Sequence, residues 1–237
     1  RILKRFINSL RSIKQFIGGV LMGLNEWDEH WSRSFVSLNV IFRLYRKYVM
    51  SNALSYFFEK YFPRKGIFVE CGSGTSLTSH MIKKRKRKLV ALDISNKALQ
   101  EARKINKIDF FVHGDTLRLP FKSSSVDGVW NLGVLEHFTQ GEIDKALKEY
   151  LRVLKKNSCV ILFWPPVYSS TGIAYRTIEK LIRFITRKNF TFYPDEISRL
   201  SSKREAISIM HRNGYKDCKV YFPWRNCFGD LVVVAKK

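Results

Sequence analysis

A glycine-containing segment is the first place in the sequence where residue types suggest ligand chemistry. Gly72 and Gly74 follow the apolar run Ile67–Cys71 and are separated by one residue. Glycine allows a positive φ angle and lets ligand atoms approach the backbone closely. A helix that begins after such a loop offers free N–H groups to anionic or polar ligand atoms. Two spaced glycines are a weak signal alone, so other residues must support a binding site.

Acidic residues stand at the ends of the next two predicted strands. Asp93 follows the run Leu89–Leu92, and Asp115 comes shortly after the run Phe110–Val112. An acid at the tip of the second strand is the position that binds a ribose diol in α/β folds, and a carboxylate on the third strand can accept a hydrogen bond from an exocyclic amine. The loop and the two acids therefore predict an adenosine pocket at the carboxyl edge of a parallel sheet.

A nicotinamide dinucleotide is the competing ligand for such a loop. Its G-x-G-x-x-G pattern requires glycine at position 77, where this chain has Leu77. Glu70, just before the loop, also suits a cationic ligand better than a pyrophosphate. These two residues disfavour the dinucleotide.

Alternating apolar and helical patterns predict the elements that position these residues. Strand–helix alternation is typical of a parallel sheet covered by helices on both faces. The last two strands should pair as an antiparallel hairpin at the sheet edge. The predicted strands are 67–71, 89–92, 110–112, 126–132, 160–164, 218–222 and 231–235, and the predicted helices are 1–24, 39–61, 76–85, 96–106, 141–155 and 195–213.

Four ordered segments resemble the class I S-adenosylmethionine-dependent methyltransferases, within them the type 11 group. The resemblance implies an α/β fold of the Rossmann-like methyltransferase type, with a mostly parallel seven-stranded sheet, an antiparallel C-terminal hairpin and helices on both faces. Residues 149–155 and 160–164 look like that family's helix and fifth strand. The matching segments are Val69–Gly74, Ala91–Ser95, Gly114–Phe121 and Ser125–Phe138.

The resemblance also implies the cofactor, S-adenosylmethionine, and the residues that bind it. One group would contact the methionine moiety, a second the ribose, a third the adenine and a fourth the sulfonium. In that order, they are Glu70, Gly72 and Gly74; Asp93 with Ile94; Asp115, Thr116 and Leu117; and Asn131 with Leu132. A third glycine common in the family's loop is Ser76 here, which we expect to act as an N-cap-like residue.

Methyl transfer needs alignment of donor and acceptor and exclusion of water more than it needs a base. His137, which follows the fourth strand with Glu136, is nevertheless a candidate to take a proton from a hydroxyl or amine acceptor. The alternative is that the Glu136–His137 pair is a structural feature below the cofactor.

Two regions are candidates for binding the acceptor. We divide the chain into an N-terminal helical cap, 1–62, and a methyltransferase domain, 63–237, with a lid insertion at about 165–194. A connection this long in a compact domain is usually functional. Trp27 and Trp31 in the cap either stack on the acceptor or pack on the core. The lid candidates are Tyr168, Tyr175, Arg176 and Tyr193.

Charge is the unusual feature of the composition. The chain has 43 Lys and Arg against 20 Asp and Glu, a net charge of +23 spread over its whole length. Such a field attracts nucleic acid, anionic lipid or anionic substrates alike. Residues 1–24 form a basic amphipathic pattern that suits either peripheral membrane contact or a cap on the domain. We interpret the basic run Lys83–Lys88 as a solvated loop on the edge opposite the cofactor, with a nucleic-acid contact as the alternative.

The four cysteines have no CxxC pair and no histidine at zinc-ligand spacing. They predict reduced thiols in a cytoplasmic protein and no metal. The pattern of residues 1–24 adds a membrane-peripheral location as a further option. The sequence thus predicts a methyltransferase acting on a small-molecule or lipid/sugar-linked acceptor. The alternatives are an RNA methyltransferase and a non-catalytic binding protein of the same fold.

Overall fold

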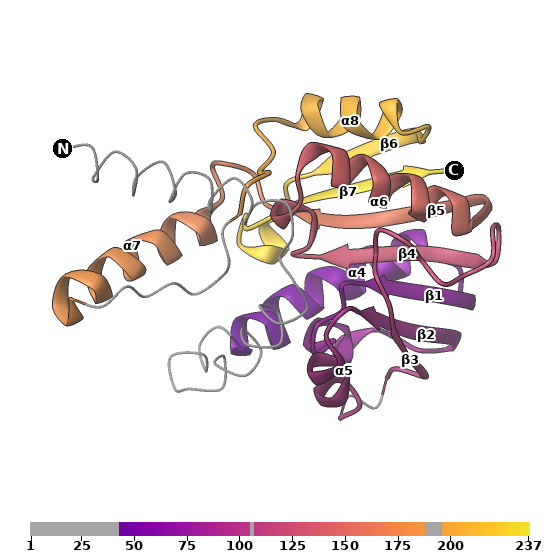
Figure 1. The fold of residues 1–237 in the computed structure, drawn as a ribbon, viewed down its shortest axis with the longest axis horizontal. Helices are drawn as coiled ribbons and strands as arrows, with labels where there is room; N and C mark the ends of the chain where they lie inside the picture. Colours follow the sequence, from indigo (N-terminus) through magenta and orange to yellow (C-terminus); the bar gives the residue numbers. More distant parts are fainter. Residues whose placement is uncertain (1–42, 105–106, 188–195) are drawn as a thin grey trace, which may run out of the picture.

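The computed structural model of the chain describes residues 43–104, 107–187 and 196–237, and they form a seven-stranded sheet (Figure 1). The strand order is β3-β2-β1-β4-β5-β7-β6; β1 to β5 run parallel, and β7 is antiparallel to both β5 and β6. The α/β fold with a C-terminal antiparallel pair is therefore confirmed. The strands are β1 Lys65–Cys71, β2 Lys86–Asp93, β3 Phe110–His113, β4 Val126–Leu132, β5 Leu154–Trp164, β6 Lys216–Tyr221 and β7 Leu231–Lys236.

Helices cover both faces of the sheet because alternate residues of each buried strand point to opposite sides. Val69 belongs to a core shared with α6 and α8, whereas its neighbour Phe68 belongs to a core shared with α4 and α5. The α-helices are α4 Ser51–Tyr61, α5 Asn96–Ala102, α6 Gln140–Val153, α7 Ser170–Thr186 and α8 Lys203–Arg212. Shorter helical turns are η1 Tyr45–Met50, η2 Leu77–Met81, η3 Leu135–His137 and η4 Trp224–Asn226.

The chain after the glycine loop departs from the expected helix over 76–85. It forms only the 3-10 turn η2, which α4 holds at its end: the Ser51 hydroxyl oxygen accepts from the Met81 N–H at 3.0 Å, and the Ser55 hydroxyl donates to the Met81 carbonyl at 2.9 Å. These side chains satisfy backbone groups that a longer helix would pair internally. The helix expected over 195–213 is also shorter, and α8 begins at Lys203 behind a Ser202 N-cap.

The N-terminal segment is described only from residue 43 onward. The predicted helix 1–24 and the residues Trp27 and Trp31 lie outside the described residues, so the cap assigned to 1–62 stays a prediction. Within it, α4 buries Phe57 and Phe58 against the sheet. None of the helices in the described part of the chain is both long enough and apolar enough to cross a membrane.

The expectation that the basic run Lys83–Lys88 is a solvated loop is wrong for its second half, which begins β2. The Arg87 side chain has no exposed surface and forms an ion pair with Glu59. Its Nε donates to the Pro63 carbonyl at 2.7 Å and its Nη2 to the Phe62 carbonyl at 2.9 Å. The guanidinium also lies 4.9 Å from the ring centroid of Phe58. Arg87 therefore fastens the end of α4 to β2.

Replacing Arg87 tests this role. Arg87→Met keeps an unbranched side chain over Phe58 but leaves buried carbonyl groups and Glu59 without their donor. We expect the free energy of unfolding to fall by about 3 kcal/mol, as when one member of a buried ion pair is removed. Urea unfolding followed by circular dichroism measures it. The exposed neighbour supplies the control: Lys86→Met should change stability by no more than about 0.5 kcal/mol, and equal effects of the two variants would contradict the assignment.

Candidate active site

The glycine loop and the acid at the end of β2 are joined directly by hydrogen bonds. The Asp93 carboxylate accepts from the Gly74 N–H at 2.7 Å and from the Ser95 N–H at 2.8 Å. It is almost completely buried, and burial raises its pKa while these backbone N–H groups oppose the rise. Each carboxylate oxygen has a second lone pair, so Asp93 can hold the loop and still accept from a ligand.

The backbone of the loop explains where glycine is required. Gly72 has φ 68°, and a Cβ there would lie 2.5 Å from Cγ2 of Val134. Ser76, at the position of the family's third glycine, adopts φ 49° in the left-handed region. Its side chain makes no capping hydrogen bond, so the expected N-cap-like role is not found. The loop is thus built around left-handed residues and not around the start of a long helix.

Glu70 lies at the end of β1, directly under the loop. It is 2% exposed and its Oε2 accepts from the Ser79 hydroxyl at 2.9 Å. Burial raises the pKa of Glu70 to about 7, and the Ser79 hydrogen bond opposes this rise. A cation placed beside the carboxylate would stabilise its ionised form.

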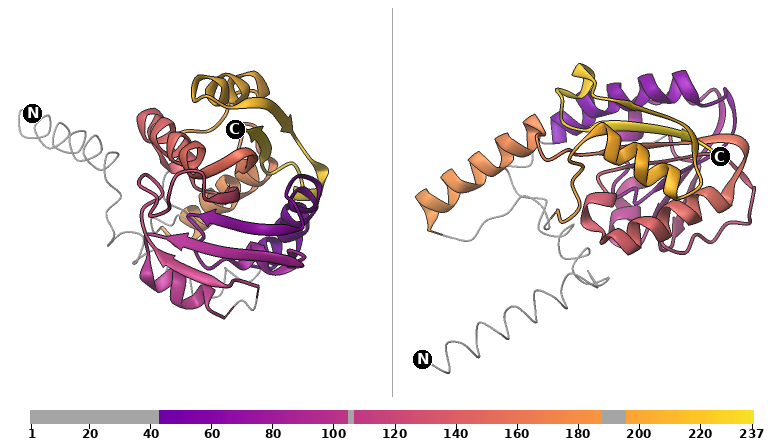
Figure 2. Two further views of the ribbon diagram at one scale, coloured as in Figure 1. Left: turned by 90° about the vertical axis from the view of Figure 1, so that its right-hand side faces the viewer. Right: turned by 90° about the horizontal axis from the view of Figure 1, so that it is seen from above.

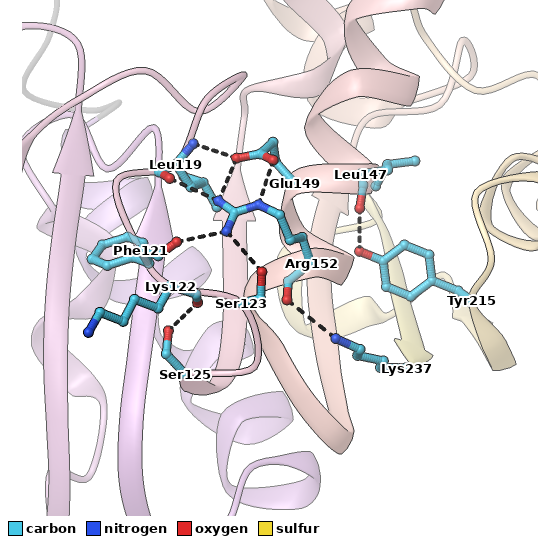
Figure 3. A network of polar contacts seen from close by, with 10 residues as sticks. All are labelled: Leu119, Phe121, Lys122, Ser123, Ser125, Leu147, Glu149, Arg152, Tyr215 and Lys237. Atoms are coloured by element: carbon cyan, nitrogen blue, oxygen red, sulfur yellow. Dashed lines mark hydrogen bonds and ion pairs between the residues drawn. The ribbon is translucent and has the colours of Figure 1, made fainter.

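The segment after β3 is held in place by α6, as Figure 3 shows. Arg152 donates to the carbonyls of Leu119 and Phe121 at 3.0 and 2.8 Å, and Glu149 accepts from the Leu119 N–H at 2.8 Å. Asp115 Oδ1 accepts from the Leu117 N–H at 2.8 Å. These contacts fix the segment assigned to the adenine at the same sheet edge as Asp93.

Asn131 and Thr116, two of the predicted cofactor-binding residues, offer only their backbone atoms to this edge. Asn131 is fully buried and donates to the Tyr150 hydroxyl at 3.3 Å; the Thr116 hydroxyl is also bonded to Tyr150, at 2.7 Å. Both side chains therefore face the α6 layer, which leaves their backbones for ligand contacts. Leu132, one residue beyond Asn131, lines a cavity instead.

A cavity of about 90 Å³ adjoins the end of β4. It contains His137, the predicted base, and its lining comes from five separate segments of the chain. The residues that line it are Tyr45, Arg46, Met50, Leu132, Gly133, Glu136, His137, Pro165, Ser169, Thr171, Gly172, Glu196, Arg199 and Asp230.

Sequence reasoning missed the charged residues of this cavity. Glu136 is 4% exposed, and its Oε2 has no hydrogen-bond partner among the described residues. Burial first, and then the charge of Glu196, raise the pKa of Glu136 well above its usual range. The same two causes raise the pKa of Asp230 to about 7, while Arg199 forms an ion pair with Glu196. Among these charged residues, only Glu136 could be recognised from the sequence, because it stands beside His137 in the family-like motif.

These acids do not make a metal centre. Within the ranges that the structure covers, no group of three or more His, Cys, Asp or Glu side chains is arranged to hold a metal ion. A cavity with several carboxyl groups and a guanidinium can instead exchange hydrogen bonds with hydroxyl, amine or carbonyl groups of a ligand.

Of the predicted acceptor residues of the lid, Tyr168 and Arg176 do not line this cavity. Tyr168 is 43% exposed and contacts the Phe222 ring edge-on, with centroids 5.5 Å apart. Arg176 lies on α7 and donates to the Gly172 carbonyl at 3.2 Å. The Tyr175 side chain and all of Tyr193 lie outside what the structure describes. The start of the lid, Pro165 to Gly172, nevertheless borders the cavity.

Comparison with known proteins adds to this geometry. The type 11 family model for a methyltransferase domain matches residues 69–162. This match and the fold support a class I S-adenosylmethionine-dependent methyltransferase. The family and the fold imply S-adenosylmethionine as the methyl donor. No curated protein matches the chain.

Solved structures share the fold of this methyltransferase at low sequence identity. A methyltransferase of Thermotoga maritima is 21% identical with TM-score 0.62, over 89% of this chain and 99% of that chain. A possible exported protein of Bordetella parapertussis is 11% identical with TM-score 0.59, over 79% and 65% of the two chains. A methyltransferase of Archaeoglobus fulgidus is 15% identical with TM-score 0.57, over 80% and 93%.

The left-handed conformation of Ser76 predicts a stabilising substitution. Ser76→Gly should raise the free energy of unfolding by about 1 kcal/mol, because a non-glycine residue in this region is strained. Gly72→Ala is the matched opposite, since its Cβ would meet Val134 at 2.5 Å. It should destabilise by more than Ser76→Gly stabilises. Thermal unfolding of both variants measures these changes in stability. A Ser76→Gly variant less stable than the wild type would contradict the conclusion that Ser76 is strained.

Proposed function

We propose that this methyltransferase acts on a small-molecule or lipid/sugar-linked acceptor that enters the cavity beside β4. The observation that carries the proposal is the position of that cavity. Its wall includes Leu132, which the family resemblance assigns to the sulfonium, and His137, which follows on η3. An acceptor atom in the cavity would lie next to the place assigned to the methyl group.

The residues present fit the cofactor. Asp93 retains lone pairs for ribose hydroxyls, with Ile94 beside it; Asp115 and the backbone of Thr116 and Leu117 would hold the adenine. The loop with Glu70, Gly72 and Gly74 would take the methionine moiety, whose amino group suits a carboxylate, and Asn131 and Leu132 would border the sulfonium. Bound there, S-adenosylmethionine supplies a methyl group on a positively charged sulfur.

Two side chains of the cavity are suited to accept a proton from the acceptor. His137 remains the proposed base, and Glu136 joins it because its buried Oε2 has no hydrogen-bond partner among the described residues and its pKa is raised. In its ionised form, a carboxylate with a raised pKa is the stronger base. The walls of the cavity, to which Pro165 and Gly172 contribute, would shield the reaction from water.

RNA as the acceptor is less well supported. It rests on the net charge of +23 alone. The basic run Lys83–Lys88 offers less charge than its sequence suggests, because Arg87 is buried and Lys84 pairs with Asp109 at 2.9 Å. A non-catalytic binding protein would need no cavity beside the cofactor edge. Cofactor binding and turnover separate that alternative from an enzyme.

Asp93 gives the direct test of the cofactor site. Asp93→Asn keeps the size of the side chain but replaces one acceptor oxygen by a donor that opposes the Gly74 or Ser95 N–H. We expect affinity for S-adenosylmethionine, measured by calorimetry, to fall at least about tenfold, the worth of one charge-assisted hydrogen bond. The exposed Asp217 supplies the control, and Asp217→Asn should bind as the wild type does. Absence of binding by folded wild-type protein would refute the proposal.

The raised pKa of Glu70 predicts that the affinity for the cofactor depends on pH. Because burial raises the pKa of Glu70 to about 7, the carboxyl group is mostly protonated at pH 6. A cation bound beside it favours the ionised form, so binding should release close to one proton at pH 6 and almost none above pH 8. Affinity should therefore rise with pH across this range. Calorimetry in buffers of different ionisation enthalpy measures the protons, and Glu70→Gln should abolish their release if Glu70 is their source.

A further inference from the structure

The helix α7 stands apart from the rest of the structure. It has 17 residues, Ser170–Thr186, and extends away from the sheet in Figure 1 and in the right-hand view of Figure 2. Its first turn is attached to the domain: the Ser169 hydroxyl caps Gly172 at 3.2 Å, and the Ser170 N–H donates to the Phe228 carbonyl at 3.3 Å. The helix therefore begins at the cavity rim and leads outward.

One face of α7 is apolar and exposed. Ile173 is 56% exposed, Leu181 57% and Phe184 83%. At about 100° per residue, these three side chains fall within an arc of about 80° on the helix surface. Exposed single apolar residues are ordinary, but three on one face of a projecting helix, with only Thr177 between them, make an apolar stripe.

Basic side chains border this stripe. Arg176, Lys180 and Arg183 are all exposed and fall within an adjoining arc of about 60°. Arg187, also exposed, follows at the C-cap. An apolar stripe flanked by Lys and Arg is the pattern of a helix that lies in the plane of a lipid surface, with its apolar side chains among the acyl chains and its cations near the headgroups.

The loop at the base of α7 continues this surface. Trp224 in η4 is 68% exposed, and the Arg225 guanidinium lies 4.9 Å from its ring. Phe228, whose carbonyl receives the Ser170 N–H, is 45% exposed. Tryptophan is enriched at the level of lipid headgroups because its ring is apolar and its N–H is polar.

We infer that α7 docks this protein on an anionic lipid surface. The helix lies on the surface and does not cross it, since a spanning helix needs about 20 mostly apolar residues and α7 contains Arg176, Lys180 and Arg183. Its net positive charge matches the negative headgroups of anionic lipids, each cation contributing to binding.

Two other binding partners, RNA and a second copy of the chain, account for fewer features of this face of α7. RNA would use the cations through its phosphates but leave Ile173 and Leu181 in water. A second copy of the chain, joined by a two-fold axis along this face, would bring the same basic side chains against each other. An anionic lipid surface accounts for the apolar stripe and the cations together.

Vesicle binding of the full chain tests the inference. Cosedimentation with vesicles of phosphatidylcholine containing phosphatidylglycerol is compared with phosphatidylcholine alone. We expect binding to the anionic vesicles that falls as salt is raised, and little binding to the neutral ones. The double variant Leu181→Ser/Phe184→Ser should lower the partition coefficient at least about tenfold. Lys180→Gln/Arg187→Gln should lower it about fivefold for each cation removed.

Matched controls alter the same residue types elsewhere. Phe110 is 54% exposed on β3 at the far edge of the sheet, and Phe110→Ser should bind vesicles as the wild type does. The exposed pair Lys145 and Lys148 on α6 controls for charge, since Lys145→Gln/Lys148→Gln should keep most of the binding. Circular dichroism checks that each variant is folded, and calorimetry with S-adenosylmethionine tests the proposed function separately on the same proteins.

Several outcomes would overturn the inference. Unchanged partitioning of both α7 variants would show that α7 does not make the lipid contact. Equal binding to neutral and anionic vesicles would show that binding is not selective for anionic lipid. A wild-type dimer that Leu181→Ser/Phe184→Ser dissociates would assign the face to a second copy. Loss of binding to an RNA oligonucleotide by the Lys180→Gln/Arg187→Gln variant, with vesicle binding intact, would assign it to nucleic acid.

Discussion

The carboxylate of Asp93 is the contact on which the cofactor edge depends. It lies at the end of β2 and accepts from N–H groups on both sides of it, Gly74 in the loop after β1 and Ser95 at the start of α5. The loop after β1 and the start of α5 are therefore both held by this one buried carboxylate. The same group is the one proposed to bind the ribose, so under that proposal one side chain serves both ligand recognition and loop position.

The sequence predicted those parts of the molecule that local patterns determine. Apolar runs such as Val126–Leu132 match β4 residue for residue, because a strand buried on both faces has no competing helical period. Asp93 and Asp115 could be assigned to one site because the ends of parallel strands meet at one edge of the sheet, and their contact with the cofactor stays a prediction. The expected antiparallel pairing of the last two strands is confirmed, as β6 and β7.

What the sequence did not predict depends on contacts between distant segments. Arg87 appears as one of six consecutive cations, and only the position of α4 makes it a buried partner of Glu59. The cavity beside β4 joins Glu136 with Glu196, Arg199 and Asp230, which are far apart in sequence and follow no motif. The Ser76 conformation was missed because its φ angle is set by the closed loop and not by its own preference.

The four thiols divide sharply in reactivity. Cys71 is fully buried and burial raises its pKa, while burial raises the pKa of Cys159 to about 12 and that of Cys218 to about 11. Cys227 alone is exposed, and its carbonyl accepts from the Ser170 hydroxyl at the base of α7. A thiol-reactive fluorophore at neutral pH will therefore attach at Cys227 first. The unaltered chain thus has its own attachment point for a probe that reports on the junction between the catalytic domain and its projecting helix.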